Sequence, residues 1–576
     1  MKSLFLTLCL LQISWCTVDR TWWKYTTMYE VYLPSFKDGN GDGMGDLIGL
    51  RTKLDHFVEI GVETIYITPH YPSPMVDGGY DITDFTAVHP DMGTMKDFEI
   101  LIREMNVRGL KLVIDVVLNH CSDQHHWFNK SVHREDPYTD FFLWQDPKGY
   151  NSDGTAVPPN NWCSVFGGSV WKWNDKRKQF YLHQFTTKQP DLNLRNEFVK
   201  NELKKILKFW VEKGVAGFRM DAVKFFVEDE QLRDEPVSSS DIKVPYYNRD
   251  LIHTRTQNQP ESYQLLHELR IFLEKVTKKY TDFQRILLTE AYYLKYSEIE
   301  LFYRWYGTKK YRISHQPLNF FLTIDNNNKN SSYYHTAINT YLGGLPEEAV
   351  PNWNMENHDM GMKGYKFGEE YAFMCTSMVM MLPGMAYLYM GQELAVTGSN
   401  VRPDQLTSNI IIGITGLNRD FFRHPMPWDD SLNGGFSTNN KVFLPLNPNF
   451  WRVNVKRQKE DPNSYYQMFK MLMNLRKTNT LKYGDFKSYV ISTWVFAFTR
   501  TYKKRDQYVV ILNLGSETEF VDLYNNVVDL SIPESMTVKM ASPNSGYKIG
   551  DQVPTKQTIP KILILRPSAV LVLGTK

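Results

Sequence analysis

The chain has 576 residues, and its 66 lysines and arginines nearly balance 64 aspartates and glutamates, for a formal net charge of +2. Hydrophobic residues make up 42% and charged residues 23%, which excludes a disordered chain and a small disulfide-stabilised domain. A net charge close to zero removes the general electrostatic reason to expect a nucleic-acid partner.

Residues 1–16 have the pattern of a secretory signal peptide. A lysine precedes the apolar run 4–13, and the small residues Ser14 and Cys16 stand at positions −3 and −1 of a cleavage site after Cys16. The apolar run is too short to span a bilayer, and a buried first strand is the alternative. One other stretch, 374–391, is as apolar, but a Pro-Gly pair interrupts it. We therefore expect a secreted protein without a transmembrane segment.

Apolar β-type runs alternate with helical patterns over most of the chain. The segment 198–214, for example, has apolar residues at helical spacing. Eight runs predict strands at 28–36, 62–69, 111–120, 215–223, 286–293, 314–322, 352–359 and 385–390. Repeated strand–helix units predict an α/β protein with a closed (β/α)8 TIM barrel. An open doubly wound sheet is the alternative, but no glycine-rich phosphate loop follows the first run.

Two other regions complete the predicted architecture. The connection between the third and fourth strands is rich in Asp, Asn, Gly, Pro and Trp, and predicts a small inserted domain at 121–191. The helical period disappears after this barrel, and alternating runs predict a C-terminal antiparallel β-sandwich domain at 485–576. The catalytic barrel would then consist of residues 17–120 and 192–484.

Three cysteines remain after cleavage at the predicted site, Cys121, Cys163 and Cys375, so one disulfide at most forms. Cys121 and Cys163 are the expected pair, because both belong to the same irregular segment. Their spacing fits no zinc site. Asn129 and Asn330 begin Asn-X-Ser sequons, which suit glycosylation of a secreted protein.

Charged side chains gather at the carboxyl ends of the predicted strands, where barrels of this type carry their chemistry. They are Asp81, Asp115, His120, Arg219, Asp221, Glu290, His358 and Asp359. Glycoside hydrolysis requires two carboxyl groups in different environments, one ionised and one holding a proton. Arg219 precedes Asp221 by two residues on one strand and so favours its ionised form. Glu290 has apolar neighbours, which raise its pKa. Structural ion pairs are the alternative.

Several motifs resemble those of the α-amylase family, glycoside hydrolase family 13. The motifs are DVVLNH (115–120), QPDLN (189–193), GFRMDAV (217–223), LLTEAYY (287–293) and ENHD (356–359). The sequence is most similar to the α-glucosidases of the oligo-1,6-glucosidase group, of which QPDLN is typical, and among these to secreted maltases of insects. The resemblance implies a retaining α-glucosidase that acts on maltose, sucrose and short α-1,4 oligosaccharides, without an organic cofactor.

The resemblance also implies roles for single residues. Asp221 would be the nucleophile and Glu290 the general acid/base. Asp359 would be the third carboxylate, which binds the sugar hydroxyls and favours the distorted ring of the transition state. His120 and His358 would form hydrogen bonds with the same sugar.

Three more residues would shape the pocket. Tyr80 would stack under the terminal glucose, Asp81 would close the pocket, and Arg423 would pair with Asp81. A closed pocket implies removal of one glucose from the non-reducing end. Retention of configuration implies carboxyl groups about 5–5.5 Å apart.

The loop DGNGDGMGD carries oxygen-bearing side chains at alternate positions, Asp38, Asn40 and Asp42, and then Asp46. Its glycines allow the tight wrap that Ca²⁺ ligation requires. The resemblance implies one bound Ca²⁺ with the backbone carbonyl of Met44 as a further ligand. A plain Asp/Gly surface turn is the alternative.

Other positions bear on specificity. Ala222, after the expected nucleophile, is similar to family members that prefer α-1,4 bonds. Glu356 and Met362 stand where the family usually has Gly and Arg, and we expect them to change the charge near the +1 sugar. A sucrase or transglucosidase is therefore the second candidate. A non-catalytic relative, such as the heavy chains of amino-acid transporters, is disfavoured by the retained carboxylates. The oligomeric state is left open.

Overall fold

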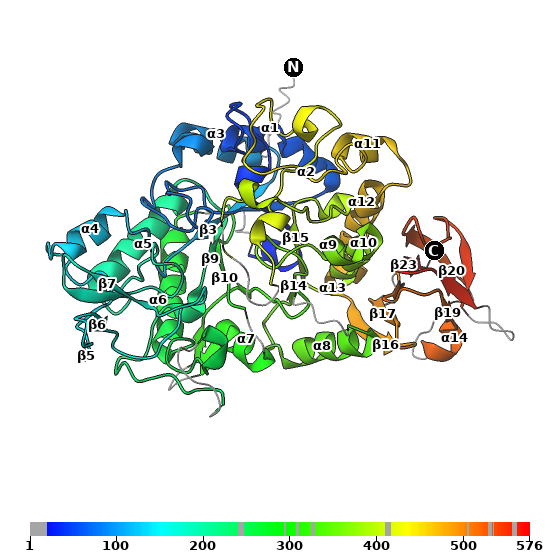
Figure 1. Ribbon diagram of the computed structural model, residues 1–576. Coiled ribbons are helices and arrows are strands. Elements are labelled where there is room, and N and C mark those ends of the chain that lie inside the picture. The colour runs from blue at the N-terminus through cyan, green and yellow to red at the C-terminus, as the bar shows by residue number, and fades with distance from the viewer. Residues whose placement is uncertain are drawn as a thin grey trace, which may run out of the picture.

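The protein is built around a parallel eight-stranded sheet that forms a nearly closed barrel (Figure 1). The barrel strands are β1 (Thr27–Val31), β2 (Thr64–Ile67), β3 (Lys111–Val116), β9 (Gly217–Met220), β10 (Ile286–Thr289), β13 (Gln316–Pro317), β14 (Asn352–Trp353) and β15 (Met385–Tyr389). Each strand overlaps one of the eight predicted runs, so the predicted barrel is confirmed.

This computed structural model describes residues 20–239, 247–280, 282–292, 295–306, 310–323, 329–408, 410, 416–503, 506–527, 533, 535–555 and 562–575. The predicted signal peptide, 1–16, lies outside these residues.

Strands follow chain order around the barrel, and β15 pairs with β1. In the described part of the chain, the sheet order ends at β13 on one side and at β14 on the other. Side-chain amides bridge this seam. The backbone N–H of Asn319 donates to Asn352 Oδ1 at 2.8 Å, and Asn352 Nδ2 donates to the Pro317 carbonyl at 2.7 Å. The amide groups therefore satisfy backbone groups that a closed sheet would pair.

Helices surround the barrel, and most of them bury one apolar face. Asn196 caps the first turn of helix α5 (Glu197–Glu212), because its side chain accepts the Phe198 N–H. The helix buries a stripe made of Val199, Leu203, Ile206, Leu207, Trp210 and Val211. The helices of this layer also include α1 (Leu47–Thr52), α2 (Leu54–Ile60), α3 (Met95–Val107), α6 (Pro260–Thr277), α7 (Tyr296–Tyr303), α8 (Ser331–Gly344), α9 (Lys363–Phe367), α10 (Glu369–Met381), α11 (Val455–Glu460), α12 (Tyr465–Arg476) and α13 (Asn479–Tyr483). No helix among the described residues is long and apolar enough to cross a bilayer.

The long connection between β3 and β9 forms a separate layer beside the barrel, seen at the left of Figure 1. It holds helix α4 (His126–Val132), a three-stranded antiparallel sheet and a two-stranded hairpin. The strands are β4 (Trp144–Gln145), β7 (Trp171–Asn174) and β8 (Gln179–Leu182) in the sheet, and β5 (Gly149–Tyr150) and β6 (Ala156–Val157) in the hairpin.

The predicted disulfide between Cys121 and Cys163 is wrong, because neither residue, nor Cys375, is part of a disulfide. Cys121 packs into the main core of the barrel, whereas the backbone of Cys163 forms an antiparallel β-bridge with Ser169 within the inserted layer. Membership of one irregular segment therefore did not place the two sulfur atoms together.

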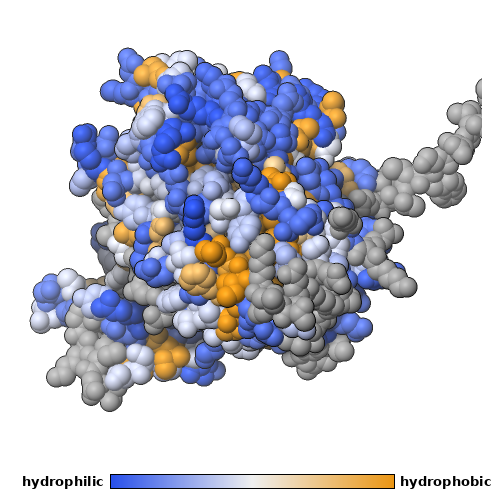
Figure 2. Space-filling view, turned by 90° about the vertical axis from the view of Figure 1, so that its right-hand side faces the viewer, coloured by the Kyte–Doolittle hydropathy of each residue, from blue (hydrophilic) through white to orange (hydrophobic). Residues whose placement is uncertain are grey.

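The C-terminal region is an antiparallel sheet domain, as predicted. Strands β16 (Asp485–Val490), β17 (Val495–Thr501), β18 (Tyr508–Asn513), β20 (Ser535–Ala541), β21 (Gln552–Pro554) and β23 (Val570–Gly574) form one sheet, and β19 (Glu519–Val521) and β22 (Leu563–Leu565) form another, beside α14 (Leu523–Asn526). Alternate residues of β17 pack on opposite faces: Phe496 and Phe498 join the barrel core, whereas Val495 and Ala497 join a second core. Figure 2 views this side of the molecule and shows an apolar strip among polar residues.

Candidate active site

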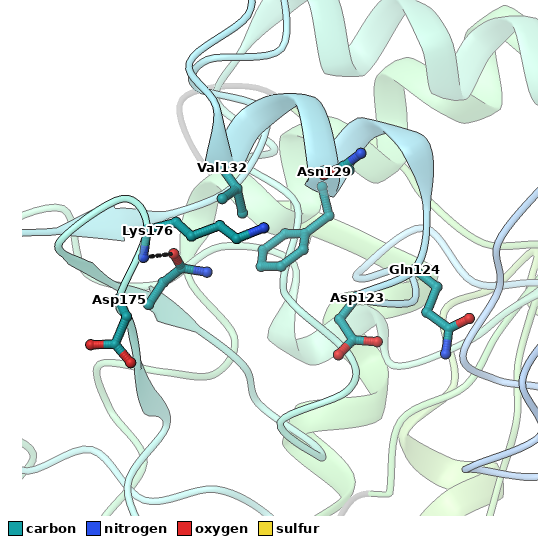
Figure 3. Close-up of a pocket in the computed structure, with 8 residues that line it drawn as sticks. Asp123, Gln124, Asn129, Val132, Asp175 and Lys176 are labelled. Carbon is teal, nitrogen blue, oxygen red and sulfur yellow. Dashed lines mark hydrogen bonds between the residues drawn. The ribbon is translucent and has the colours of Figure 1, made fainter.

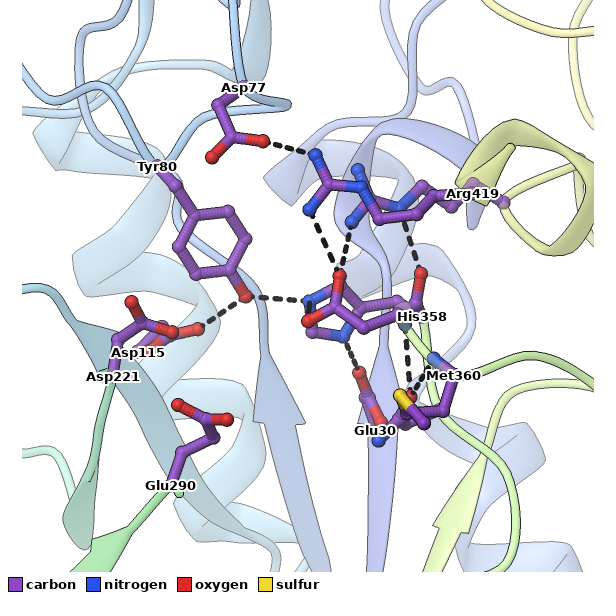
Figure 4. A network of polar contacts seen from close by, with 12 residues as sticks. Glu30, Asp77, Tyr80, Asp115, Asp221, Glu290, His358, Met360 and Arg419 are labelled. Carbon is purple, nitrogen blue, oxygen red and sulfur yellow. Dashed lines mark hydrogen bonds and ion pairs between the residues drawn. The ribbon is translucent and has the colours of Figure 1, made fainter. Parts of the chain in front are cut away.

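The structure brings together carboxylates from separate strands at one end of the barrel. Asp115 lies in β3, Asp221 follows β9, Glu290 follows β10, and Asp359 follows β14. Figure 4 shows Asp115, Asp221 and Glu290 below Tyr80, and Arg219 contacts both Asp115 and Asp221. Asp221 is 9% exposed and Glu290 is 5% exposed. Parallel strands end at the same face of a barrel, which explains why residues so far apart in sequence meet here.

Arg219 connects two of these carboxylates. Its Nη1 donates to Asp221 Oδ1 and, at 3.1 Å, to each carboxylate oxygen of Asp115. Burial raises the pKa of Asp221, Arg219 lowers it, and the charge of Glu290 raises it again. The expected contact with Arg219 is therefore present. Burial nevertheless raises the pKa of Asp221 by more than Arg219 lowers it, and the sequence did not predict this burial. The guanidinium contact still distinguishes Asp221 from Glu290, because it stabilises the ionised form directly.

Glu290 is fixed beside Asp221 by the backbone. The N–H of Ala222 donates to Glu290 Oε2 at 2.8 Å. Ala222 adopts a φ of 54°, a left-handed conformation that is uncommon for a residue with a Cβ and is often found at functional sites. Burial raises the pKa of Glu290, which confirms the predicted direction, while Arg219 and the Ala222 N–H lower it. Glu290 accepts no guanidinium N–H among the hydrogen bonds of its described side chain, and this distinguishes it from Asp221 as the candidate proton donor.

Asp359 lies in a positively charged environment. Its Oδ1 accepts Arg423 Nη2 at 2.8 Å and Arg419 Nη1 at 3.1 Å, and its Oδ2 lies 3.4 Å from His358 Nε2. Burial alone would raise the pKa of Asp359, but His358, Arg419 and Arg423 together hold it well below its usual range. Asp359 is therefore ionised at neutral pH.

The predicted pairing of Arg423 with Asp81 is wrong. Asp81 accepts the backbone N–H groups of Val76 at 2.9 Å and Asp77 at 3.1 Å, so its carboxylate stabilises the turn that precedes Tyr80. Arg423 instead pairs with Asp359. Asp81 therefore supports the wall of the pocket and does not close it.

Asp77 and Arg419 form an ion pair in the position that was expected for Asp81 and Arg423. Gln189, the first residue of QPDLN, donates its Nε2 to Asp77 Oδ2 at 2.9 Å and contacts His120 Nε2 at 3.2 Å. Sequence reasoning missed all three side chains. The available signal was their place in or beside motifs: Asp77 stands three residues before Tyr80, and Arg419 four before Arg423.

The aromatic and histidine side chains lie in the same network. The ring of Tyr80 stacks on His358 with centroids 5.7 Å apart, and its hydroxyl donates to Asp115 Oδ2 at 2.8 Å. Burial lowers the pKa of His120 to about 4, so this imidazole is neutral. Tyr80, His120 and His358 therefore stand where the motifs were expected to bring them.

The loop expected to bind Ca²⁺ lies outside this network. The carboxylate of Asp38 accepts the Asn40 N–H at 3.1 Å, Asp42 accepts the Met44 N–H at 2.8 Å, and Asp46 caps helix α1. The described residues contain no group of three or more His, Cys, Asp and Glu side chains arranged to hold a metal ion. Calcium binding therefore stays a prediction.

The two sequons lie apart from the carboxylates. Asn129 is exposed on α4 and borders a surface pocket of about 360 Å³ in the inserted layer (Figure 3). The other residues of this pocket are Asp123, Gln124, Phe128, Val132, Asn174, Asp175 and Lys176. Asn330 caps α8, and its Oδ1 accepts the Tyr333 N–H at 2.9 Å. Glycosylation at both positions stays a prediction.

Glu356 and Met362, which depart from the family pattern, are buried. Glu356 Oε1 accepts the backbone N–H of Lys363 at 2.8 Å, and Met362 packs into the main core. One oxygen of the additional carboxylate is thus directed at the backbone that follows Asp359.

Comparison with known proteins identifies the family. The model of the α-amylase catalytic domain matches residues 30–484. The chain belongs to the α-amylase family. Maltase 1 of Drosophila virilis is 38% identical over 541 residues, which cover 92% of this chain and 84% of that protein. The crystal structure of the α-glucosyl transfer enzyme XgtA has a TM-score of 0.81 and 30% identity, and the match covers 96% of this chain and 99% of that one.

Sequence identity alone does not separate the enzymes of this α-amylase family from other relatives. The human amino acid transporter heavy chain SLC3A1 is 35% identical over 539 residues, covering 93% of this chain and 76% of that protein. The network of Asp221, Glu290 and Asp359 is the more specific observation. With this catalytic domain and these three carboxylates, of which Asp221 and Glu290 are buried, the chemistry of the chain is that of a glycoside hydrolase.

Proposed function

We propose that the protein is a secreted, retaining α-glucosidase that releases glucose from the non-reducing end of maltose, sucrose and short α-1,4 oligosaccharides. The observation that carries the proposal is the contrast between neighbouring carboxyls: Arg219 contacts Asp221, whereas Glu290 accepts only a neutral N–H among the hydrogen bonds of its described side chain. The similarity to Maltase 1 supports the substrate class.

Asp221 acts as the nucleophile in the first step. Its carboxylate attacks the anomeric carbon, while Glu290 donates a proton to the glycosidic oxygen that leaves. The products of this step are a glucosyl ester on Asp221 and the departing sugar. Asp359 binds the sugar hydroxyls as an anion, since Arg419 and Arg423 keep it ionised.

Water completes the reaction from the face that the leaving sugar vacated. The Glu290 carboxylate accepts a proton from this water, and the water oxygen attacks the anomeric carbon. The ester bond to Asp221 breaks, α-glucose is released, and Glu290 again holds its proton. Two displacements at one carbon give net retention.

The ion pair between Asp77 and Arg419 supports cleavage at chain ends. Both side chains are buried, and Arg419 also contacts Asp359 at 3.1 Å. A bound sugar whose hydroxyls reach Asp359 would therefore meet this ion pair, and we expect the pair to block a further sugar beyond it. Gln189 reinforces the wall through its hydrogen bond to Asp77.

Product analysis of the purified protein tests the proposal. We expect glucose from maltose and sucrose and slower release from isomaltose, because Ala222 follows the nucleophile. Oligosaccharides that dominate at high sucrose would favour the second candidate, a transglucosidase, which the similarity to an α-glucosyl transfer enzyme also supports. No activity on any of the three sugars would contradict both.

We also propose export through the sequence at 1–16, with cleavage after Cys16 and glycans on Asn129 and Asn330. Exposure of Asn129 supports access by the modifying enzyme. The similarity to a protein named salivary alpha-glucosidase, of Aedes aegypti, supports export.

The loop that begins at Asp38 is proposed to bind one Ca²⁺ through Asp38, Asn40, Asp42, Asp46 and the Met44 carbonyl. Carboxylate and carbonyl oxygens are the ligands that Ca²⁺ prefers, and the ion would brace the loop against helix α1. Chelation should lower the Tm by about 1 °C for each kcal/mol of binding free energy lost, because a chain of this length has a large entropy of unfolding. Differential scanning calorimetry with and without chelator measures this shift, and an unchanged Tm would contradict the site.

A further inference from the structure

A buried carboxylate lies inside the barrel beneath the site. Glu30 belongs to β1 and is 0% exposed. It lies two residues after Met28, so both side chains are on the same face of the strand, and Met28 packs in the barrel interior. Barrel interiors are normally filled by apolar branched side chains, and a buried carboxylate is costly unless a partner stabilises it. Neither the proposed reaction steps nor the motif pattern uses this residue.

His358 is the ion-pair partner of Glu30 in the described part of the chain. Glu30 Oε1 contacts His358 Nδ1, as Figure 4 shows. The other oxygen, Oε2, is buried without a hydrogen-bond partner among the described residues. Burial raises the pKa values of Tyr387 and Tyr389 well above their usual range, and the charge of Glu30 is the next contribution. No lysine or arginine of the described chain forms an ion pair with Glu30.

The opposite edge of the His358 ring faces the proposed sugar site. Its Nε2 lies 2.8 Å from the Tyr80 hydroxyl and 3.4 Å from Asp359 Oδ2. The rings of Tyr80 and Tyr32 lie nearly parallel to the imidazole, at interplanar angles of 6° and 17°. Arg423 Nε donates to the His358 carbonyl at 2.9 Å, so this guanidinium is held on the backbone side.

The hydrogen-bond partners of the His358 ring indicate which of its two nitrogen atoms carry a hydrogen. An ionised Glu30 only accepts, so Nδ1 must carry a hydrogen. The Tyr80 hydroxyl has one hydrogen, and Asp115 Oδ2 accepts it at 2.8 Å. The Tyr80 oxygen can then only accept from His358, so Nε2 must carry a hydrogen as well. Both ring nitrogens are donors only in the imidazolium form.

We propose that Glu30 is a positioning residue that keeps both ring nitrogens of His358 protonated, so that the ring holds the Tyr80 hydroxyl through its Nε2–H and places a positive charge beside Asp359. The proposal rests on the proposed α-glucosidase function for its kinetic consequences. Its structural content, the protonation of one imidazole, does not depend on that function.

Glu30→Gln separates charge from shape, because the amide keeps an accepting oxygen at nearly the same volume. We expect kcat/KM for maltose to fall about 10- to 100-fold at neutral pH, as for loss of a hydrogen bond involving a charged group. The ratio of variant to wild-type activity should recover as the pH falls, because acid protonates His358 without help from Glu30. Glu30→Asp, which keeps the charge, should restore part of the wild-type profile.

Glu393→Gln is the matched control. Glu393 is also fully buried and accepts Tyr29 Oη at 2.9 Å and His56 Nε2 at 3.0 Å, but it lies outside the carboxylate network. Its variant should keep the wild-type pH profile. A variant-to-wild-type ratio for Glu30→Gln that is constant with pH would overturn the proposal, because a purely structural defect lowers activity equally at every pH.

An ¹⁵N–¹H spectrum of the histidine rings tests the proposal without substrate. The wild-type protein should show two N–H signals for His358 at neutral pH, assigned with His358→Gln. A single N–H signal would overturn the proposal even if the kinetic variants fail to fold. If the wild-type protein shows two signals but cleaves none of the three sugars, the proposed function fails while this inference stands.

Discussion

Asp221→Asn is expected to lower kcat on maltose by a factor on the order of 10⁴ or more, the size of loss seen when an enzyme loses its covalent nucleophile. The amide cannot form the glucosyl ester. Glu290 does not take over this role, because the Ala222 N–H holds its carboxyl group in place as the proton donor. The fold should persist, because Arg219 keeps its two contacts at 3.1 Å with Asp115. Steady-state kinetics beside a thermal melt measure both effects.

Asp229→Asn provides the control for this loss. Asp229 lies in the same connection after β9, but it pairs with Arg233 at 2.6 Å, outside the carboxylate network. Its variant should keep kcat within about threefold, since changes away from the reacting atoms remove no transition-state contact. Equal losses in both variants, or an active Asp221→Asn enzyme, would contradict the assignment of the nucleophile.

Glu290→Gln should lower kcat on maltose by about 10²–10⁴-fold, the contribution of a positioned general acid. Hydrolysis of α-glucosyl fluoride should fall far less in the first step, because fluoride leaves without a proton. Burial raises the pKa of Glu290, so the wild-type acid stays protonated to higher pH than an ordinary carboxyl. Activity on maltose should therefore decline as the pH rises through that value, and this alkaline decline should be absent in the variant.

Glu228→Gln is the matched control for this acid. Burial raises the pKa of Glu228 to about 7, and Gln184 Nε2 donates to it at 3.1 Å. Glu228 is thus a second buried glutamate with a raised pKa in the connection that follows Asp221. Its variant should keep the alkaline decline. A decline that disappears with Glu228 but persists without Glu290 would reassign the acid.

The barrel was predictable because its strands are short apolar runs at regular intervals, and parallel strands must end at one face. The same reasoning placed Asp221 and Glu290 together, although they are 69 positions apart in the sequence. The strands at the seam were predicted too long: β13 and β14 are two residues each, because side-chain amides replace the backbone pairing there.

Contacts between loops were not predictable in the same way. Asp77 and Asp81 lie in one turn, and no periodicity indicates which carboxylate faces the pocket. Arg419 meets Asp77 across 342 positions of sequence, and only the folded loops bring the two together. The wrong prediction of a disulfide between Cys121 and Cys163 has the same origin, since one irregular segment crosses from the barrel to the inserted layer.

The most direct test of the mechanism is to trap its covalent intermediate. A 5-fluoro-α-glucosyl fluoride should react with the enzyme quickly and leave it slowly, since fluorine on the ring destabilises the charged transition state of both steps while fluoride remains a good leaving group. Peptide mass spectrometry should then find one glucosyl adduct, on Asp221, and none in Asp221→Asn. A label on any other residue would contradict the assignment of Asp221 as the nucleophile.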